Sequence, residues 1–76
     1  MGKFEKLFGE FFGLAESEVH DDIKYQEIES WDSINHLNFV TILEENYKIE
    51  FDMDEIIDMS SVKKIKEIIK KHNVDP

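Results

Sequence analysis

Apolar residues recur at the spacing of an amphipathic helix in separate segments of this 76-residue chain. In such a helix, residues at positions i, i+3, i+4 and i+7 share one face. Two segments, one near each end of the chain, place their apolar residues in this way: Phe4, Leu7, Phe8 and Phe11, and Val62, Ile65, Ile68 and Ile69. Gly13 is a stop signal for the first helix, and Ser60 or Ser61 is a cap for the last. Both segments are therefore predicted to be helices that bury one face.

A third segment, residues 33–47, is apolar on two faces. At about 100° per residue, one face carries Phe39, Val40, Leu43 and Tyr47, with His36 in the same arc. The opposite face carries Ile34, Leu37 and Thr41, near Glu44 and Glu45. We expect the first face to pack in the core and the second to be a docking patch for partner proteins. The alternative is that neighbouring loops cover the two apolar side chains of this second face.

Between the helices the sequence predicts one loop and one short helix. Residues 15–30 are rich in acids, and their apolar anchors predict a loop that packs across the helix ends. Asp52, followed three residues later by Glu55, resembles a capping box before a short helix at 53–59. We therefore predict one domain, residues 1–76, that is all-α and forms a small four-helix bundle of three longer helices and one short one.

Composition narrows the classes of function. Asp and Glu number 18 against 9 Lys and Arg, and the resulting net charge of −9 argues against nucleic acid and anionic membrane surfaces as partners. Residues 14–61 are acidic, whereas residues 62–76 sum to +3. The chain has no cysteine, and no run approaches the roughly 20 apolar residues of a membrane span. We expect a cytoplasmic monomer without membrane insertion, without a metal site, and with basic protein surfaces as partners.

The most specific signal is the pair Asp32-Ser33 at the start of the 33–47 segment. An Asp there caps free backbone N–H groups and suits the positive end of the helix dipole. Ser33 falls in the first turn, where a phosphate on its hydroxyl would lie beside unsatisfied N–H groups. This stretch, Asp32-Ser33-Ile34 before a long helix, resembles the modification site of acyl carrier proteins. The resemblance extends from about Lys3 to Lys71.

The resemblance implies a function. In acyl carrier proteins the serine that matches Ser33 carries covalent 4′-phosphopantetheine, which a phosphopantetheinyl transferase attaches from coenzyme A, and the Asp that matches Asp32 flanks it. The arm holds acyl groups as thioesters for acyl-loading and acyl-transferring enzymes with basic docking surfaces, in fatty acid, polyketide or related pathways, and the carrier itself is not an enzyme. Family members also use the positions that match Ile34, Leu37, Thr41, Glu44 and Glu45 to contact partners. Trp31, Asn35 and Asn38 depart from the fatty acid carriers and favour a specialised pathway.

Two other interpretations concern Ser33 and its neighbours, and a further expectation concerns the acyl chain. A cofactor-free helical interaction module would use Ser33 only as an ordinary cap residue and bind a partner helix through Ile34 and Leu37. A hydrolase using Ser33 and His36 is rejected, because the chain has no nucleophile elbow and His36 faces the core as a structural residue. If an acyl chain folds back into the bundle, we expect it to lie in a cleft lined by buried apolar residues of the second and last helices: Phe39, Leu43, Ile65 and Ile69.

Overall fold

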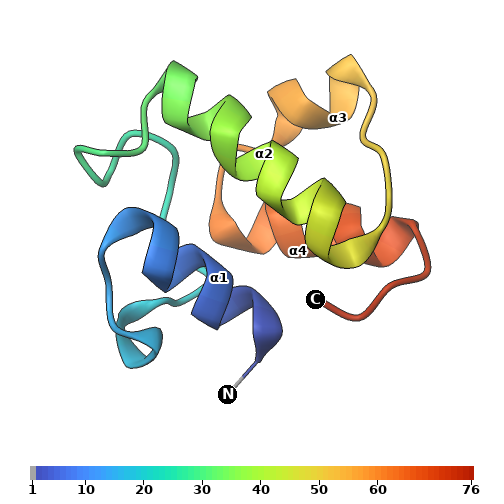
Figure 1. Ribbon diagram of the computed structural model, residues 1–76. Coiled ribbons are helices and arrows are strands. Elements are labelled where there is room, and N and C mark those ends of the chain that lie inside the picture. Colours follow the sequence, from blue (N-terminus) through green and yellow to red (C-terminus); the bar gives the residue numbers. More distant parts are fainter. Residues whose placement is uncertain (1) are drawn as a thin grey trace.

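The computed structural model describes residues 2–76, which form four α-helices and one turn of 3₁₀ helix (Figure 1). The elements are, in order, α1 (Lys3–Phe12), η1 (Glu16–Glu18), α2 (Ser33–Tyr47), α3 (Met53–Asp58) and α4 (Val62–Lys71). The predicted small all-α bundle with three longer helices and one short one is confirmed. The bounds of α2 are those predicted, and α3 ends one residue earlier than expected.

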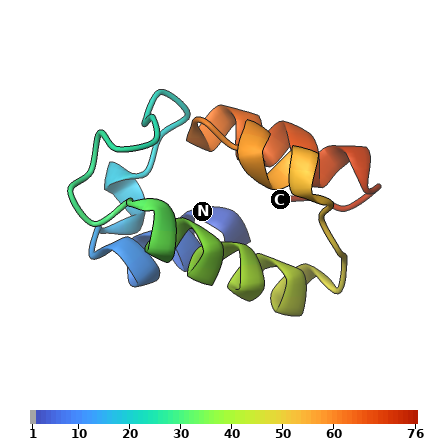
Figure 2. The ribbon, with the colours of Figure 1, turned by 90° about the horizontal axis from the view of Figure 1, so that it is seen from above.

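The helices lie in two pairs. Seen from above, α1 and α2 lie on one side of the molecule and α3 and α4 on the other, with the 13–32 loop closing one end (Figure 2). The apolar faces predicted for α2 and α4 point inward, since Phe39, Val40, Leu43 and Tyr47 on α2 are buried, as is the stripe on α4 that begins at Val62. Gly13 ends α1 in the left-handed conformation, with φ of 79°, and its N–H donates to the Gly9 carbonyl.

An aromatic cluster joins the loop to the first two helices. Trp31 is completely buried, and its ring centroid lies 5.3 Å from that of Phe8 and 5.6 Å from that of Phe12. Phe8 in turn meets Phe39 of α2 edge to face at 5.4 Å. Aromatic rings in such contacts bury large apolar areas and fix each other's orientation. Because Trp31 immediately precedes Asp32, this cluster anchors the chain just before α2 begins.

The 13–32 loop is also bonded to the start of α4. The first N–H groups of a helix have no intrahelical acceptor, and here the loop supplies two: Val62 N–H donates to the Ile23 carbonyl at 2.8 Å and Lys63 N–H to the Asp21 carbonyl at 3.2 Å. The Ser61 hydroxyl accepts from the next amide of α4 at 3.1 Å. Val19 and Ile23 are buried beneath this contact. The loop therefore packs across helix ends, as its apolar anchors predict.

One lysine of α4, Lys66, is less exposed to solvent than the other lysines of the helix. Lys66 is mostly buried and lies between Glu5 of α1 and Asp21 of the loop, with 2.9 Å between its Nζ and the Asp21 carboxylate. Burial by itself raises the pKa of Glu5, but the hydrogen bond and charge of Lys66 outweigh it and hold that pKa below its usual value. A second hydrogen bond, from the Lys66 ammonium to the Asp21 carboxylate, lowers the pKa of Asp21. The ion pairs tie α1, the loop and α4 together.

Candidate functional site

Ser33 is the first residue of α2 and its side chain is exposed. Asp32 adopts an extended backbone as the cap residue, and its Oδ1 accepts a hydrogen bond from the Asn35 N–H at 2.8 Å. This confirms the predicted cap. Asn35 is half-buried, and its side-chain amide donates to the Ser30 carbonyl at 2.8 Å. The start of α2 is thus held from two sides, while the Ser33 hydroxyl faces outward.

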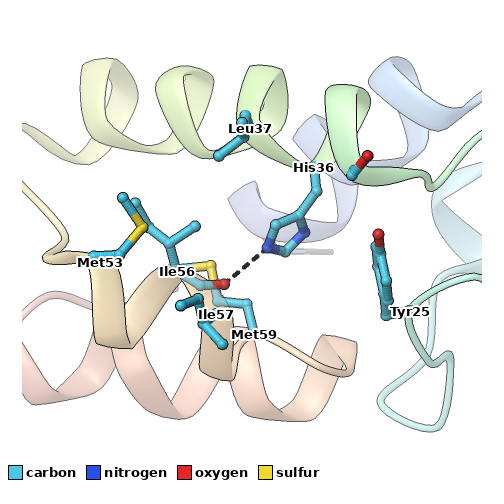
Figure 3. A pocket seen from close by; sticks show the side chains of 8 residues that line it. Tyr25, His36, Leu37, Met53, Ile56, Ile57 and Met59 are labelled. Atoms are coloured by element: carbon cyan, nitrogen blue, oxygen red, sulfur yellow. Dashed lines mark hydrogen bonds between the residues drawn. The ribbon is translucent and has the colours of Figure 1, made fainter.

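A cavity of about 270 Å³ opens beside Ser33, between α2, α3 and the loop (Figure 3). The residues that line it come from all three segments: Tyr25, Ser33, His36, Leu37, Met53, Ile56, Ile57 and Met59. This cavity differs from the cleft expected for an acyl chain. The four residues predicted for that cleft, Phe39, Leu43, Ile65 and Ile69, are buried in the core and do not line this space. Helical periodicity indicates which face points inward, but not whether the facing side chains leave a gap.

His36 forms one wall of the cavity. Its Nδ1 accepts a hydrogen bond from the Trp31 indole N–H at 2.9 Å, and its Nε2 lies 2.9 Å from the Ile56 carbonyl oxygen of α3 (Figure 3). An indole nitrogen only donates and a carbonyl oxygen only accepts, so the neutral ring protonated on Nε2 satisfies both partners. The predicted structural role is therefore supported by two contacts. The link to α3 could not be inferred from the helix pattern.

Tyr25 closes the cavity on the side of the loop. Its ring meets Trp31 edge to face at 5.8 Å and His36 at 5.5 Å, and its backbone N–H donates to the Ser60 carbonyl at 2.9 Å. In Figure 3 its hydroxyl points toward α2. The sequence marks Tyr25 only as an apolar anchor of the loop, so its place in the wall is a finding of the structure.

Four large apolar side chains around the cavity are exposed to solvent, and we call them the apolar surface: Ile34 (71% exposed), Leu37 (54%), Met53 (66%) and Ile57 (73%). No loop covers Ile34 or Leu37, so the alternative that neighbouring segments bury them is wrong for residues 2–76. The two α3 members, Met53 and Ile57, were not predicted from the sequence. Their apolar character in a short helix was the available signal, but only the packing of α3 shows that they face outward.

The remaining residues of the predicted docking patch lie further along α2. Thr41 and Glu45 are exposed, and with Glu44 they line a shallow groove that continues to residues 48–50. Glu44 is half-buried, and its Oε2 accepts a hydrogen bond from the Phe51 N–H at 2.9 Å. Its carboxylate is therefore partly used to hold the chain that follows α2, while Glu45 is fully available to a partner.

Within residues 2–76, no group of three or more His, Asp or Glu side chains is arranged to hold a metal ion. None of the helices described is long and apolar enough to cross a membrane.

Compared with models of known protein families and with curated proteins, the chain matches neither a family nor a protein.

Proposed function

We propose that this protein is an acyl carrier in which Ser33 bears a 4′-phosphopantetheine arm. The observation that carries the proposal is the setting of Ser33: an exposed hydroxyl on the first residue of α2, behind the Asp32 cap and beside an apolar cavity. Exposed Ile34 and Leu37 adjoin it. This combination suits a group that must be attached by one enzyme and then presented to others.

The residues around Ser33 fit such a group. A phosphodiester on its hydroxyl lies at the positive end of the α2 dipole, close to the Ser33 and Ile34 N–H groups, which have no intrahelical acceptor. The cavity has a volume of about 270 Å³. A water molecule occupies about 30 Å³ in the liquid, so the cavity can hold several groups of that size and has room for a short acyl chain. The chain has no cysteine, and the thiol of the attached arm supplies the sulfur that a thioester needs.

Attachment requires only the serine hydroxyl from this protein. The Ser33 oxygen attacks the pantetheine-bearing phosphorus of coenzyme A and forms a new phosphoester bond. The bond from that phosphorus to the bridging pyrophosphate oxygen breaks, adenosine 3′,5′-bisphosphate leaves, and the serine proton passes to a base of the transferase. Thereafter the protein works by tethering, which raises the effective concentration of the acyl group at each partner enzyme.

Partner enzymes dock on the apolar surface and the neighbouring acids. A net charge of −9 steers the carrier to basic surfaces and speeds encounter more than it strengthens binding. Four exposed apolar side chains bury a small area, as suits a carrier that must leave one enzyme for the next. Fatty acid, polyketide and related pathways all use this kind of partner.

The test is the intact mass of the protein after incubation with coenzyme A and a broad-specificity phosphopantetheinyl transferase. We expect the wild type to gain one phosphopantetheine and Ser33→Ala to gain none. Ser17→Ala, which alters an exposed serine on η1, is the matched control and should be modified like the wild type. Folded, unmodified wild type that gains no mass would overturn the proposal.

The exposed apolar surface favours a second candidate, a cofactor-free interaction module. A partner helix would then cover Ile34, Leu37, Met53 and Ile57 without any modification of Ser33. The same mass experiment separates the two candidates, because the module gains no mass. Its partner would bind Ser33→Ala as tightly as the wild type.

A further inference from the structure

Tyr25 brings a hydroxyl without a protein partner to the wall of the cavity. Its ring is fixed by edge-to-face contacts with Trp31 and His36, and its backbone N–H is bonded to the Ser60 carbonyl. The side chain is half-buried, its hydroxyl points toward α2 (Figure 3), and this hydroxyl makes no hydrogen bond within residues 2–76. A phenolic O–H both donates and accepts, so it is available to a molecule that enters the cavity.

The other side chains of the wall leave Tyr25 as the group that can recognise the contents of the cavity. His36 uses both ring nitrogens, one for the Trp31 indole N–H and the other for the Ile56 carbonyl. The Ser33 hydroxyl is the attachment point under the proposed function. The remaining side chains that line the cavity are apolar: Leu37, Met53, Ile56, Ile57 and Met59. Apart from Ser33, the Tyr25 hydroxyl is thus the free polar group among the described lining side chains.

The lining also restricts the chemistry of those contents. None of the described residues that line the cavity is Asp, Glu, Lys or Arg. An ammonium or a carboxylate buried there would have no countercharge, which costs far more than burial of a hydroxyl or a keto group. A purely apolar chain suits the methionines and isoleucines, but it covers the Tyr25 hydroxyl and leaves that group unpaired. An oxygen on the chain within reach of Tyr25 removes this cost.

We propose that Tyr25 determines which acyl group is held: its hydroxyl bonds a hydroxyl or keto oxygen on a short, uncharged acyl chain whose carbons pack on Met53, Ile56 and Ile57. The cavity of about 270 Å³ holds about nine groups of the size of a water molecule, which limits the chain to a length near that of a hexanoyl group. Delivery of the chain by an arm on Ser33 rests on the proposed function. Recognition by Tyr25 can be measured without that arm.

Free esters test the recognition in full-length Ser33→Ala, which has neither the arm nor the second hydroxyl of the wall. The probes are methyl hexanoate, methyl 3-hydroxyhexanoate and methyl 5-hydroxyhexanoate, and their binding is followed by nuclear magnetic resonance of the Leu37 and Ile57 methyl groups. We expect the added substitution Tyr25→Phe to weaken binding of at least one hydroxylated ester roughly fivefold, the factor for one hydrogen bond. Binding of methyl hexanoate should stay the same or tighten, because no hydroxyl is then left unpaired.

The same comparison is made on the loaded carrier, with acyl phosphopantetheine transferred from hexanoyl-coenzyme A or its hydroxylated analogues and confirmed by intact mass. Tyr25→Phe should accelerate hydrolysis of a hydroxylated thioester by up to roughly fivefold and leave that of the hexanoyl thioester unchanged. Tyr47→Phe is the matched control, since Tyr47 is the other tyrosine of the chain and its buried hydroxyl also has no hydrogen-bond partner within residues 2–76. Tyr47 does not line the cavity, so this variant should behave like the wild type.

The two experiments separate failure of this inference from failure of the proposed function. A protein that gains no mass from the transferase is not a carrier, and the ester titration then decides the role of Tyr25 alone. Equal weakening of all three esters by Tyr25→Phe would mean that the hydroxyl bonds the carbonyl they share, and selection of an oxygen-bearing chain would be wrong. Ester binding that does not respond to Tyr25→Phe, or no binding of any ester, would overturn the inference as well.

Discussion

The helices α3 and α4 follow one another in the chain but are held in opposite ways. Four side chains of α4 are buried in the core, beginning with Val62 and ending with Ile69, whereas α3 buries none. The shorter helix is fixed by polar contacts and one partly buried side chain: its capping box, the contacts with His36 and His72, an exposed ion pair between Asp58 and Lys64 at 3.4 Å, and Ile56, which packs against the core. Hydrophobic burial stabilises a helix far more than exposed ion pairs do.

The difference shows how so small a domain can carry both stability and a binding surface. Because α4 supplies the core, the apolar side chains of α3 need not be buried, and Met53 and Ile57 remain at the surface beside the cavity. The cost is that α3 is the helix most easily detached. Local stability in proteins is uneven in this way, and binding segments are drawn from the less stable part.

Removal of core volume from α4 should have the largest effect. Ile65 is completely buried, and Ile65→Ala should lower the free energy of unfolding by about 2–5 kcal/mol through lost burial and a residual cavity. This is a large part of the stability of a domain this small. Urea unfolding followed by circular dichroism measures it. A loss below about 1 kcal/mol would show that α4 carries less of the core than its burial indicates.

Loss of the α3 cap should have a smaller and more local effect. Oδ1 of Asp52 accepts from the Glu55 N–H at 2.8 Å, and Asp52→Ala removes this bond at a cost of about 1 kcal/mol. Hydrogen exchange should accelerate in α3 but not in α4. Asp54→Ala, at an exposed acid in the same turn, is the matched control and should change exchange less. Equal effects of the two variants would contradict a specific role for the capping box.

The ion pairs of Lys66 should give α4 an acid-sensitive contribution of about 1 kcal/mol or less, since Asp21 is largely exposed. The pKa values of Glu5 and Asp21 are lowered from 4.5 and 3.8 by folding. Their contribution is therefore complete above these unfolded values and is lost as the pH falls through the lower folded ones. Unfolding free energies measured between about pH 6 and 3 should fall more steeply for the wild type than for Lys66→Met. Lys70→Met, at an exposed position, should behave like the wild type.

Local features of this fold were predictable from the sequence, and contacts between distant segments were not. The cap at Asp32, the capping box at Asp52 and the stop at Gly13 each depend on residues within one helical turn, so local rules suffice. The burial of Trp31 and the bonds of His36 depend on where an irregular loop and a six-residue helix meet α2. Helical periodicity in the sequence does not predict where these segments contact α2.

The same distinction between local features and contacts of distant segments applies to the candidate site. Ser33 and the outward position of Ile34 and Leu37 follow from the helical pattern of α2 alone. The cavity beside Ser33 was not predicted, because its walls come from three segments and its existence depends on how far α3 stands from α2. The ion pairs of Lys66 likewise could not be predicted, since its two acidic partners lie 61 and 45 residues away in the sequence.

The smallest effect on stability is expected at Ile57, which is the most exposed large apolar residue of α3. Ile57→Ser should change the free energy of unfolding by less than about 0.5 kcal/mol, because the side chain makes little contact in the free protein. If the apolar surface docks partner enzymes, the same change should lower kcat/KM for phosphopantetheine transfer by up to roughly tenfold, since a partner buries this side chain. A large loss of stability would show that α3 is held by apolar packing after all, and the contrast with α4 would fail. Unchanged stability with unchanged transfer would keep the contrast but remove Ile57 from the surface that the transferase uses.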